Sequence, residues 1–172
     1  GFRNCTLILN SAYNQSNSTA ITNNANNNFS LTGMNSGIYN WTANCTDVVG
    51  LGAIATPRRF IIDFLAPAIN LSAPGVNETL TTRDVSFNYT AFDDFDSTLS
   101  CNLTLDGSLN QSNVAAPNST SVNQSVRLNT GGLHRWNVTC IDDAGNRNLT
   151  DIRNFTVLLP PTVSLVRPAA GA

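Results

Sequence analysis

Apolar and polar residues alternate along several short segments of the chain, with the two-residue period of β-strands. In segment 133–141, Trp136 and Cys140 fall on one face of such a strand, while Arg135 and Asn137 fall on the other. No stretch shows a convincing helical period. About seven short strands, with turn residues every ~8–12 positions, predict an all-β fold of the β-sandwich class. The expected core includes the aromatic residues Trp41, Trp136, Phe87 and Tyr89.

The same pattern occurs twice. Residues 5–64 recur as residues 101–159. A repeat of this length is a whole small domain rather than the short unit of a solenoid. The correspondence pairs Cys5, Trp41 and Cys45 with Cys101, Trp136 and Cys140.

The repeat predicts three parts. Residues 1–65 form a domain that lacks its first strands, because the equivalent of residues 67–100 is missing from it. Residues 66–160 form a complete domain. Residues 161–172 resemble the segment that opens the complete domain, and we expect them to be the first strand of a following or neighbouring domain.

An incomplete sandwich exposes strand edges and an open core, which makes it unstable and adhesive. Two arrangements would complete it. The chain could be an excerpt of a longer tandem polypeptide, or the tail 161–172 of another copy could add a donor strand through Val163 and Leu165. A head-to-tail contact that does not close produces an open filament. The sequence leaves both arrangements open, and both give a linear array.

Each repeat contains two cysteines at inward strand positions, about 40 residues apart. Bonds within each domain, Cys5 with Cys45 and Cys101 with Cys140, are the natural arrangement for a small extracellular domain. In the chain-entropy model, closing a loop of ~40 residues contributes on the order of 4 kcal/mol. The alternatives are buried free thiols or a zinc site, although the Cys-x-x-Cys spacing of zinc ribbons is absent.

Composition narrows the function. Charged residues make up 12% of the 172 positions, the net charge is −2, and all nine basic residues are arginine. A nucleic-acid-binding protein needs a basic surface, which this chain lacks. No apolar run approaches the ~20 residues that cross a bilayer. No signal peptide is present, so we expect a processed or excerpted segment.

Asparagine, serine and threonine replace charge as the solubilising residues, and many form Asn-X-Ser/Thr acceptor sequons for N-linked glycans. Segment 39–45 places Asn40, Thr42 and Asn44 on its outward face, as glycosylation requires. An Asn- and Thr-rich β protein also contains sequons by chance. The candidate acceptors are Asn4, Asn14, Asn17, Asn28, Asn40, Asn44, Asn70, Asn77, Asn88, Asn102, Asn110, Asn118, Asn123, Asn137, Asn148 and Asn154.

Residues for catalysis are scarce. The single histidine, His134, occupies the position of Tyr39 in the first repeat, so we interpret it as a packing residue and expect no catalytic site. Oxygen-rich loops of a sandwich can bind calcium, but aspartate is also an ordinary turn residue, and we expect no metal or other cofactor besides glycans. The weak calcium candidates are Asp93, Asp94, Asp96, Asp142 and Asp143.

Segments 87–93, 99–107 and 132–146 resemble the Ig-like repeats of large archaeal and bacterial surface proteins, most specifically in the pattern Trp-x-Val-x-Cys-x-Asp-x-Ala-Gly-Asn. The first repeat departs from this pattern after Cys45. Antibody-type domains differ, because their tryptophan lies on a strand between those of the two cysteines, and their disulfide joins opposite sheets. Here Trp136 shares the strand of Cys140, so the bond is expected to join neighbouring strands.

The resemblance implies a structural role, since such repeats build stalks, layers and filaments. We therefore expect an extracellular, N-glycosylated subunit that assembles with copies of itself at a cell surface. Two alternatives stay open. An adhesin or carbohydrate-binding module would need an exposed aromatic platform, and an accessory repeat of a large secreted enzyme would be recognised from flanking sequence.

Overall fold

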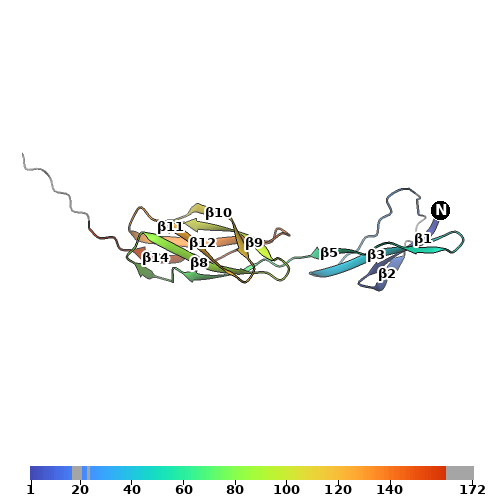
Figure 1. The fold of residues 1–172 in the computed structure, drawn as a ribbon, viewed down its shortest axis with the longest axis horizontal. Coiled ribbons are helices and arrows are strands. Elements are labelled where there is room, and N and C mark those ends of the chain that lie inside the picture. The colour runs from blue at the N-terminus through green and yellow to red at the C-terminus, as the bar shows by residue number, and fades with distance from the viewer. Residues whose placement is uncertain (17–20, 23, 162–172) are drawn as a thin grey trace, which may run out of the picture. The chain divides into compact units, whose positions relative to one another are not determined.

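The computed structural model describes residues 1–16, 21–22 and 24–161. Over these residues the chain forms strands and no helices, so the all-β prediction is confirmed. The chain divides into two compact units, Gly1–Leu65 and Ala66–Ala172. The chain and its strands are drawn in Figure 1.

The second unit contains two sheets (Figure 1). The smaller sheet has the order β11-β8-β6, formed by Ser121–Arg127, Asp84–Phe92 and Ala68–Ala73. The larger sheet has the order β10-β9-β12-β14-β7, and β13 pairs with β12. Its strands are β7 (Glu78–Leu80), β9 (Thr98–Leu105), β10 (Ser108–Pro117), β12 (Gly132–Ile141), β13 (Arg147–Leu149) and β14 (Arg153–Val157).

Aromatic side chains from both sheets form the core of this unit. Phe87 of β8 makes edge contacts with two rings of the larger sheet, Trp136 at 5.2 Å and Phe155 at 5.7 Å between ring centroids. Tyr89 is also fully buried, and burial raises the pKa of its hydroxyl to about 12. The edge contacts of Phe87 with Trp136 and Phe155 stabilise the core beyond the area that they bury. Phe87 is therefore the side chain that joins the two layers.

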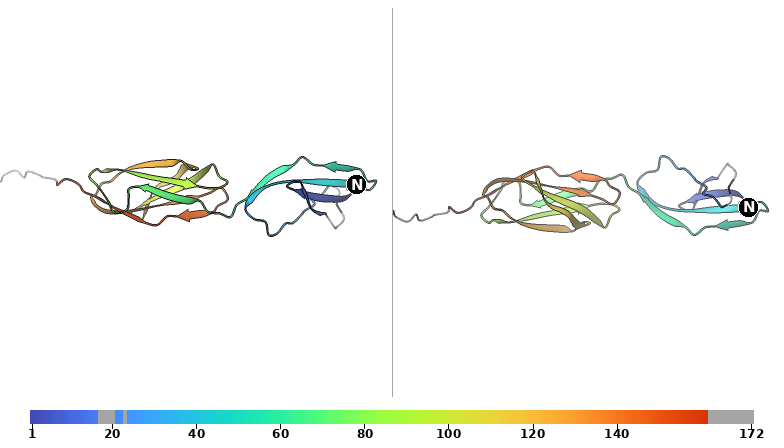
Figure 2. Two further views of the ribbon diagram at one scale, coloured as in Figure 1. Left: turned by 90° about the horizontal axis from the view of Figure 1, so that it is seen from below. Right: turned by 90° about the horizontal axis from the view of Figure 1, so that it is seen from above.

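The first unit contains one sheet. Its strands are β1 (Phe2–Leu9), β2 (Ala12–Ser16), β3 (Gly37–Asp47), β4 (Gly52–Ile54) and β5 (Arg58–Ile62). Their order is β2-β1-β3-β4, and β5 pairs with the first half of β3. Residues 24–36 contain no strand (Figure 2). No described residue of this unit belongs to a second sheet.

The single sheet of the first unit repeats the centre of the larger sheet in the second. Strands β1, β3, β4 and β5 pair as β9, β12, β13 and β14 do. The turns after the second cysteines also match, since Asp47 N donates to Leu51 O and Asp142 N donates to Asn146 O. Each of these aspartates accepts a further hydrogen bond from the turn backbone. The repeat therefore preserves a sheet, and the two units differ in what covers it.

Both predicted disulfides are present, and each joins neighbouring strands. Cys5 on β1 lies opposite Cys45 on β3, with their Cα atoms 4.0 Å apart. Cys101 on β9 lies opposite Cys140 on β12, with their Cα atoms 4.1 Å apart. In both pairs the two cysteines are direct partners in the register of antiparallel strands, which brings their side chains together on one face of the sheet. Each bond therefore fixes the register of one sheet and leaves the contact between sheets non-covalent.

Trp41 and Thr42 differ from the sequence predictions. Trp41 was expected in the core with Trp136, but it is only half-buried, because no described residue of the first unit forms an equivalent of β8 over it. Thr42 was expected on the outward face, but 7% of its surface is exposed. Its hydroxyl donates to the carbonyl oxygen of Ala55 at 2.7 Å, so the segment after β4 covers that part of the outer face.

The role of Phe87 can be tested by substitution. Phe87→Ala removes the ring that contacts Trp136 and Phe155, and a buried Phe→Ala change costs about 3–5 kcal/mol. Phe92→Ala is the matched control, since Phe92 follows on the same strand and is 41% exposed. We expect chemical denaturation to show a large loss of stability for the first variant and a loss below about 1 kcal/mol for the second. Similar losses would contradict this account of the core.

The two disulfides should differ in importance. We expect the variant C5A/C45A to lose amide-exchange protection in β3, because the first unit has no second sheet to hold its strands. The variant C101A/C140A should keep protection in β12, since Phe87 and its neighbours still hold the layers together, although loss of the bond costs about 2–5 kcal/mol. Hydrogen exchange followed by mass spectrometry measures both strands in each variant. Equal protection in β3 and β12 of both variants would refute the difference.

Candidate functional site

The inward face of the first unit's sheet lies under irregular chain and is only partly filled. It borders a groove of about 340 Å³. The groove is lined by sheet residues Leu7, Leu9, Trp41 and Phe60, and by Phe29 and Met34 from the loop before β3. Leu7 is almost fully buried, whereas Trp41 and Phe60 remain half-exposed.

Comparison with the second unit shows what this face lacks. Phe60 stacks on Tyr39 at 5.3 Å, as Phe155 stacks on His134 at 5.4 Å. In the second unit the ring of Phe87 then contacts Phe155 from the opposite sheet. No described residue of the first unit does the same for Phe60. The face is therefore a sheet surface that a second layer of strands could cover.

The sequons fall into two groups by exposure. Asn17 lies outside the described residues, as do the proposed donor residues Val163 and Leu165. Six acceptor candidates are half-buried, namely Asn4, Asn88, Asn102, Asn118, Asn137 and Asn154. The exposed candidates are Asn14, Asn28, Asn40, Asn44, Asn70, Asn77, Asn110, Asn123 and Asn148.

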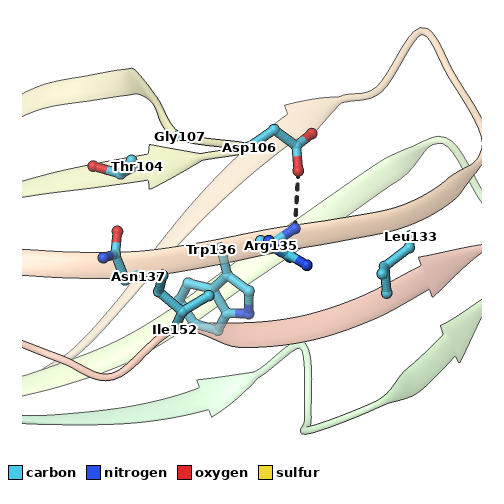
Figure 3. Close-up of a pocket in the computed structure, with 8 residues that line it drawn as sticks. All are labelled: Thr104, Asp106, Gly107, Leu133, Arg135, Trp136, Asn137 and Ile152. Carbon is cyan, nitrogen blue, oxygen red and sulfur yellow. Dashed lines mark hydrogen bonds between the residues drawn. The ribbon is translucent and has the colours of Figure 1, made fainter.

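A second groove, of about 450 Å³, lies on the outer side of β12 (Figure 3). Thr104, Arg135, Asn137 and Ile152 line it, and the backbone amide of Arg135 donates to Asp106 at 2.9 Å. The aromatic residue of its lining, Trp136, is 1% exposed and belongs to the core. The groove therefore offers polar and aliphatic groups, without the exposed aromatic platform that a carbohydrate-binding module would use.

His134 is buried and pairs with an acid. Its Nδ1 lies 2.7 Å from an Asp106 carboxylate oxygen, and its Nε2 faces the carbonyl oxygen of Thr130 at 3.3 Å. Asp106 follows β9, so the pair fastens the β9–β10 turn to β12. A Ser-His-Asp triad would instead direct the second ring nitrogen at a hydroxyl. The contacts of His134 match the packing role predicted for it.

Three of the five acidic residues weighed as calcium ligands, Asp93, Asp96 and Asp142, act as turn and loop acceptors. One oxygen of Asp93 accepts the amides of Phe95 and Asp96, each at 2.9 Å. Both oxygens of Asp142 bind Asn146, and Asp96 accepts the amide of Asp143 at 2.7 Å. Aspartate favours turns for this reason. These bonds join the loop after β8 to the turn after β12.

The surroundings of Asp96, including the neighbouring acidic residues, shift the pKa of its carboxyl group. The hydrogen bond from the Asp143 amide lowers the pKa of Asp96, but desolvation and the negative charges of Asp143, Asp93 and Asp142 outweigh it and raise this pKa above 3.8. Asp96 therefore binds its proton more tightly in the folded state than in the unfolded state. By linkage, its contribution to stability is present below pH 3.8 and is lost as the pH rises through the raised value.

Comparisons with known proteins give limited matches. No family model matches the chain. The chain is 33% identical over 103 residues to halomucin of Haloquadratum walsbyi, a match that covers 60% of the chain and 1% of halomucin. A solved structure of fibronectin(III)-like modules of Clostridium thermocellum CbhA aligns with a TM-score of 0.42 and 18% identity, over 92% of this chain and 78% of that one.

The two disulfides favour an extracellular location, because disulfides form and persist in oxidising compartments. Within the described residues, no helix has the length and apolar character to span a bilayer.

Asp96→Asn tests the acidic cluster. The variant removes one negative charge and keeps an oxygen that can accept the Asp143 amide. We expect its melting temperature to exceed that of the parent at pH 7 by about 1–4 °C, and to match it near pH 3, where Asp96 is protonated. Asp94→Asn, at an exposed acid of the same loop, controls for the change in net charge. A lower melting temperature for the Asp96 variant at pH 7 would exclude net repulsion at this site.

Proposed function

We propose that the chain is a structural segment of an extracellular, N-glycosylated filament or surface array built from tandem Ig-like domains. One observation supports this most strongly. The first unit repeats the sheet of the second, including its disulfide and its paired aromatic rings, but its described residues form no second sheet over the apolar face. A sheet with one apolar face must bury that face against another element. Contacts between domains of an array would meet this need.

The proposed donor is the tail 161–172. Val163 and Leu165 correspond in the repeat to Ile69 and Leu71 of β6, which pack on the core of the second unit. The tail of one copy would thus place apolar side chains on the open sheet of the next copy, by strand addition. A complete second layer also needs an equivalent of β8, because β6 pairs with β8 in the second unit. A neighbouring domain of a longer tandem polypeptide would supply both strands.

Surface chemistry fits an exposed structural role. Charged residues are few, and the exposed strand positions are rich in asparagine, serine and threonine. Low-charge β surfaces associate laterally, and bulky hydrophilic glycans would oppose that association. We propose these glycans as the chain's non-protein component, and copies of the same domain as its partners.

Deletion of residues 161–172 tests the strand exchange. We expect the full chain to form linear polymers, visible by electron microscopy and by light scattering, and the deletion to abolish them. In the full-length chain, V163D/L165D should act like the deletion, because it places charges on the inward face of the donor strand. Ser164→Asp is the matched control, since alternation along the proposed donor strand would put Ser164 on the face opposite Val163 and Leu165.

Polymers of equal stability after the deletion would overturn strand exchange through the tail. If the full chain itself remained monomeric at every concentration tested, self-assembly of this segment would be excluded.

A further inference from the structure

Sequons within strands can be classified by the face of the sheet on which their side chains lie. Asparagine and its hydroxyl residue are two positions apart, which is also the period of a strand, so both side chains lie on one face. The outer face of the β11-β8-β6 sheet holds three such sequons, and its register places Asn123 opposite Asn88 and Asn70 opposite Thr90. The members are Asn70–Ser72, Asn88–Thr90 and Asn123–Ser125.

Two of these three acceptors are accessible. Asn70 and Asn123 are exposed, as are their hydroxyl partners Ser72 and Ser125. Among the described residues, neither side-chain amide makes a hydrogen bond. Asn88 lies on the central strand and is half-buried, with its Oδ1 atom enclosed. The accessible acceptors of this sheet therefore lie on its two outer strands, β6 and β11.

Asn118 is in the opposite situation. Its Nδ2 donates two hydrogen bonds, to the carbonyl oxygens of Asp93 at 2.6 Å and Asp96 at 2.7 Å. Its Oδ1 accepts the backbone amide of Asp93 at 3.2 Å and the hydroxyl of Ser119 at 3.0 Å. Asn118 thus fastens the loop after β8 to the turn between β10 and β11.

Asn148 makes a similar connection on another side of the unit. Its Nδ2 donates to the carbonyl oxygen of Pro67 at 2.8 Å, and its Oδ1 accepts the amide of Leu149 at 2.8 Å. The bond to Pro67 joins residues 81 positions apart in the sequence. Asn148 therefore holds the start of the second unit against β13.

We infer that Asn70 and Asn123 are glycan acceptors, and that Asn118 is a structural tie that remains unmodified. This inference rests on the proposed glycosylation of the chain and specifies where it occurs. In the transfer, Nδ2 forms a bond to the anomeric carbon of a lipid-phosphate-linked sugar, the bond from that carbon to the phosphate oxygen breaks, and the phosphate leaves with the electron pair. The amide loses one proton to a base of the transferase. A modified Nδ2 keeps one N–H group, so Asn118 could not keep both of its donated bonds.

The distribution can be measured on the full chain secreted by a host with N-glycosylation machinery. Enzymatic glycan release in heavy-oxygen water converts each occupied asparagine to labelled aspartate, which peptide mass spectrometry locates. We expect occupancy at Asn70 and Asn123 and none at Asn118. Occupancy at Asn118 comparable to that at Asn123 would overturn the inference while leaving the proposed glycosylation intact. Absence of glycans at every sequon would overturn the proposed glycosylation itself.

A second experiment tests the tie at Asn118 without any glycan. In full chain made by a secretory host that lacks N-glycosylation, Asn118→Asp keeps the size of the side chain and removes both donated bonds. We expect it to lower the melting temperature by about 5 °C or more, since two carbonyl oxygens would then face a carboxylate. Asn123→Asp, the same change at an accessible acceptor, should shift it by about 1 °C or less. Equal shifts in the two variants would overturn the structural role of Asn118.

Discussion

Burial of one apolar sheet face is the constraint on which this molecule depends. In the second unit that face is covered by β8, whose Phe87 lies against Trp136 and Phe155 and joins the two layers. The first unit presents the same sheet and leaves Trp41 half-buried beneath irregular chain. A few kcal/mol decide whether a small domain folds, so the absence of one aromatic contact layer is a large deficit. Its relief by another domain is the physical basis of the proposed array.

The position of the disulfides makes such relief possible. A bond between opposite sheets would tie the second layer to the first covalently. Here Cys5 and Cys45 join adjacent strands of one sheet, as Cys101 and Cys140 do. Each bond preserves the register of the sheet whether or not a second layer is present. A second layer held by apolar contacts alone can come from another domain or another copy, which is what strand addition requires.

Much of this architecture follows from local patterns, and the exceptions have physical causes. The two-residue period and the repeated cysteines predicted both disulfides and the central strands of both units, but not every strand of their sheets. The two-residue period did not predict the burial of Thr42, because the residue that covers it, Ala55, lies outside the strand of Thr42. Strand β10 was not predicted, since its bulged, polar sequence shows weak alternation. The match between the turns that follow Asp47 and Asp142 was also missed, because residues 48–51 and 143–146 share a backbone hydrogen bond but carry different side chains.

The different roles of individual asparagines are the feature that the sequence alone predicts least. The tripeptides at Asn118 and Asn123 both satisfy the Asn-X-Ser/Thr pattern. Their structural difference arises from a loop more than 20 positions away, whose carbonyl groups accept both hydrogen bonds from the Asn118 amide. In a chain this poor in charge, the same residue type must both solubilise strands and satisfy buried backbone groups. Long-range packing thus separates asparagines with accessible side chains from asparagines whose amides hold distant backbone groups, a distinction that a count of sequons does not make.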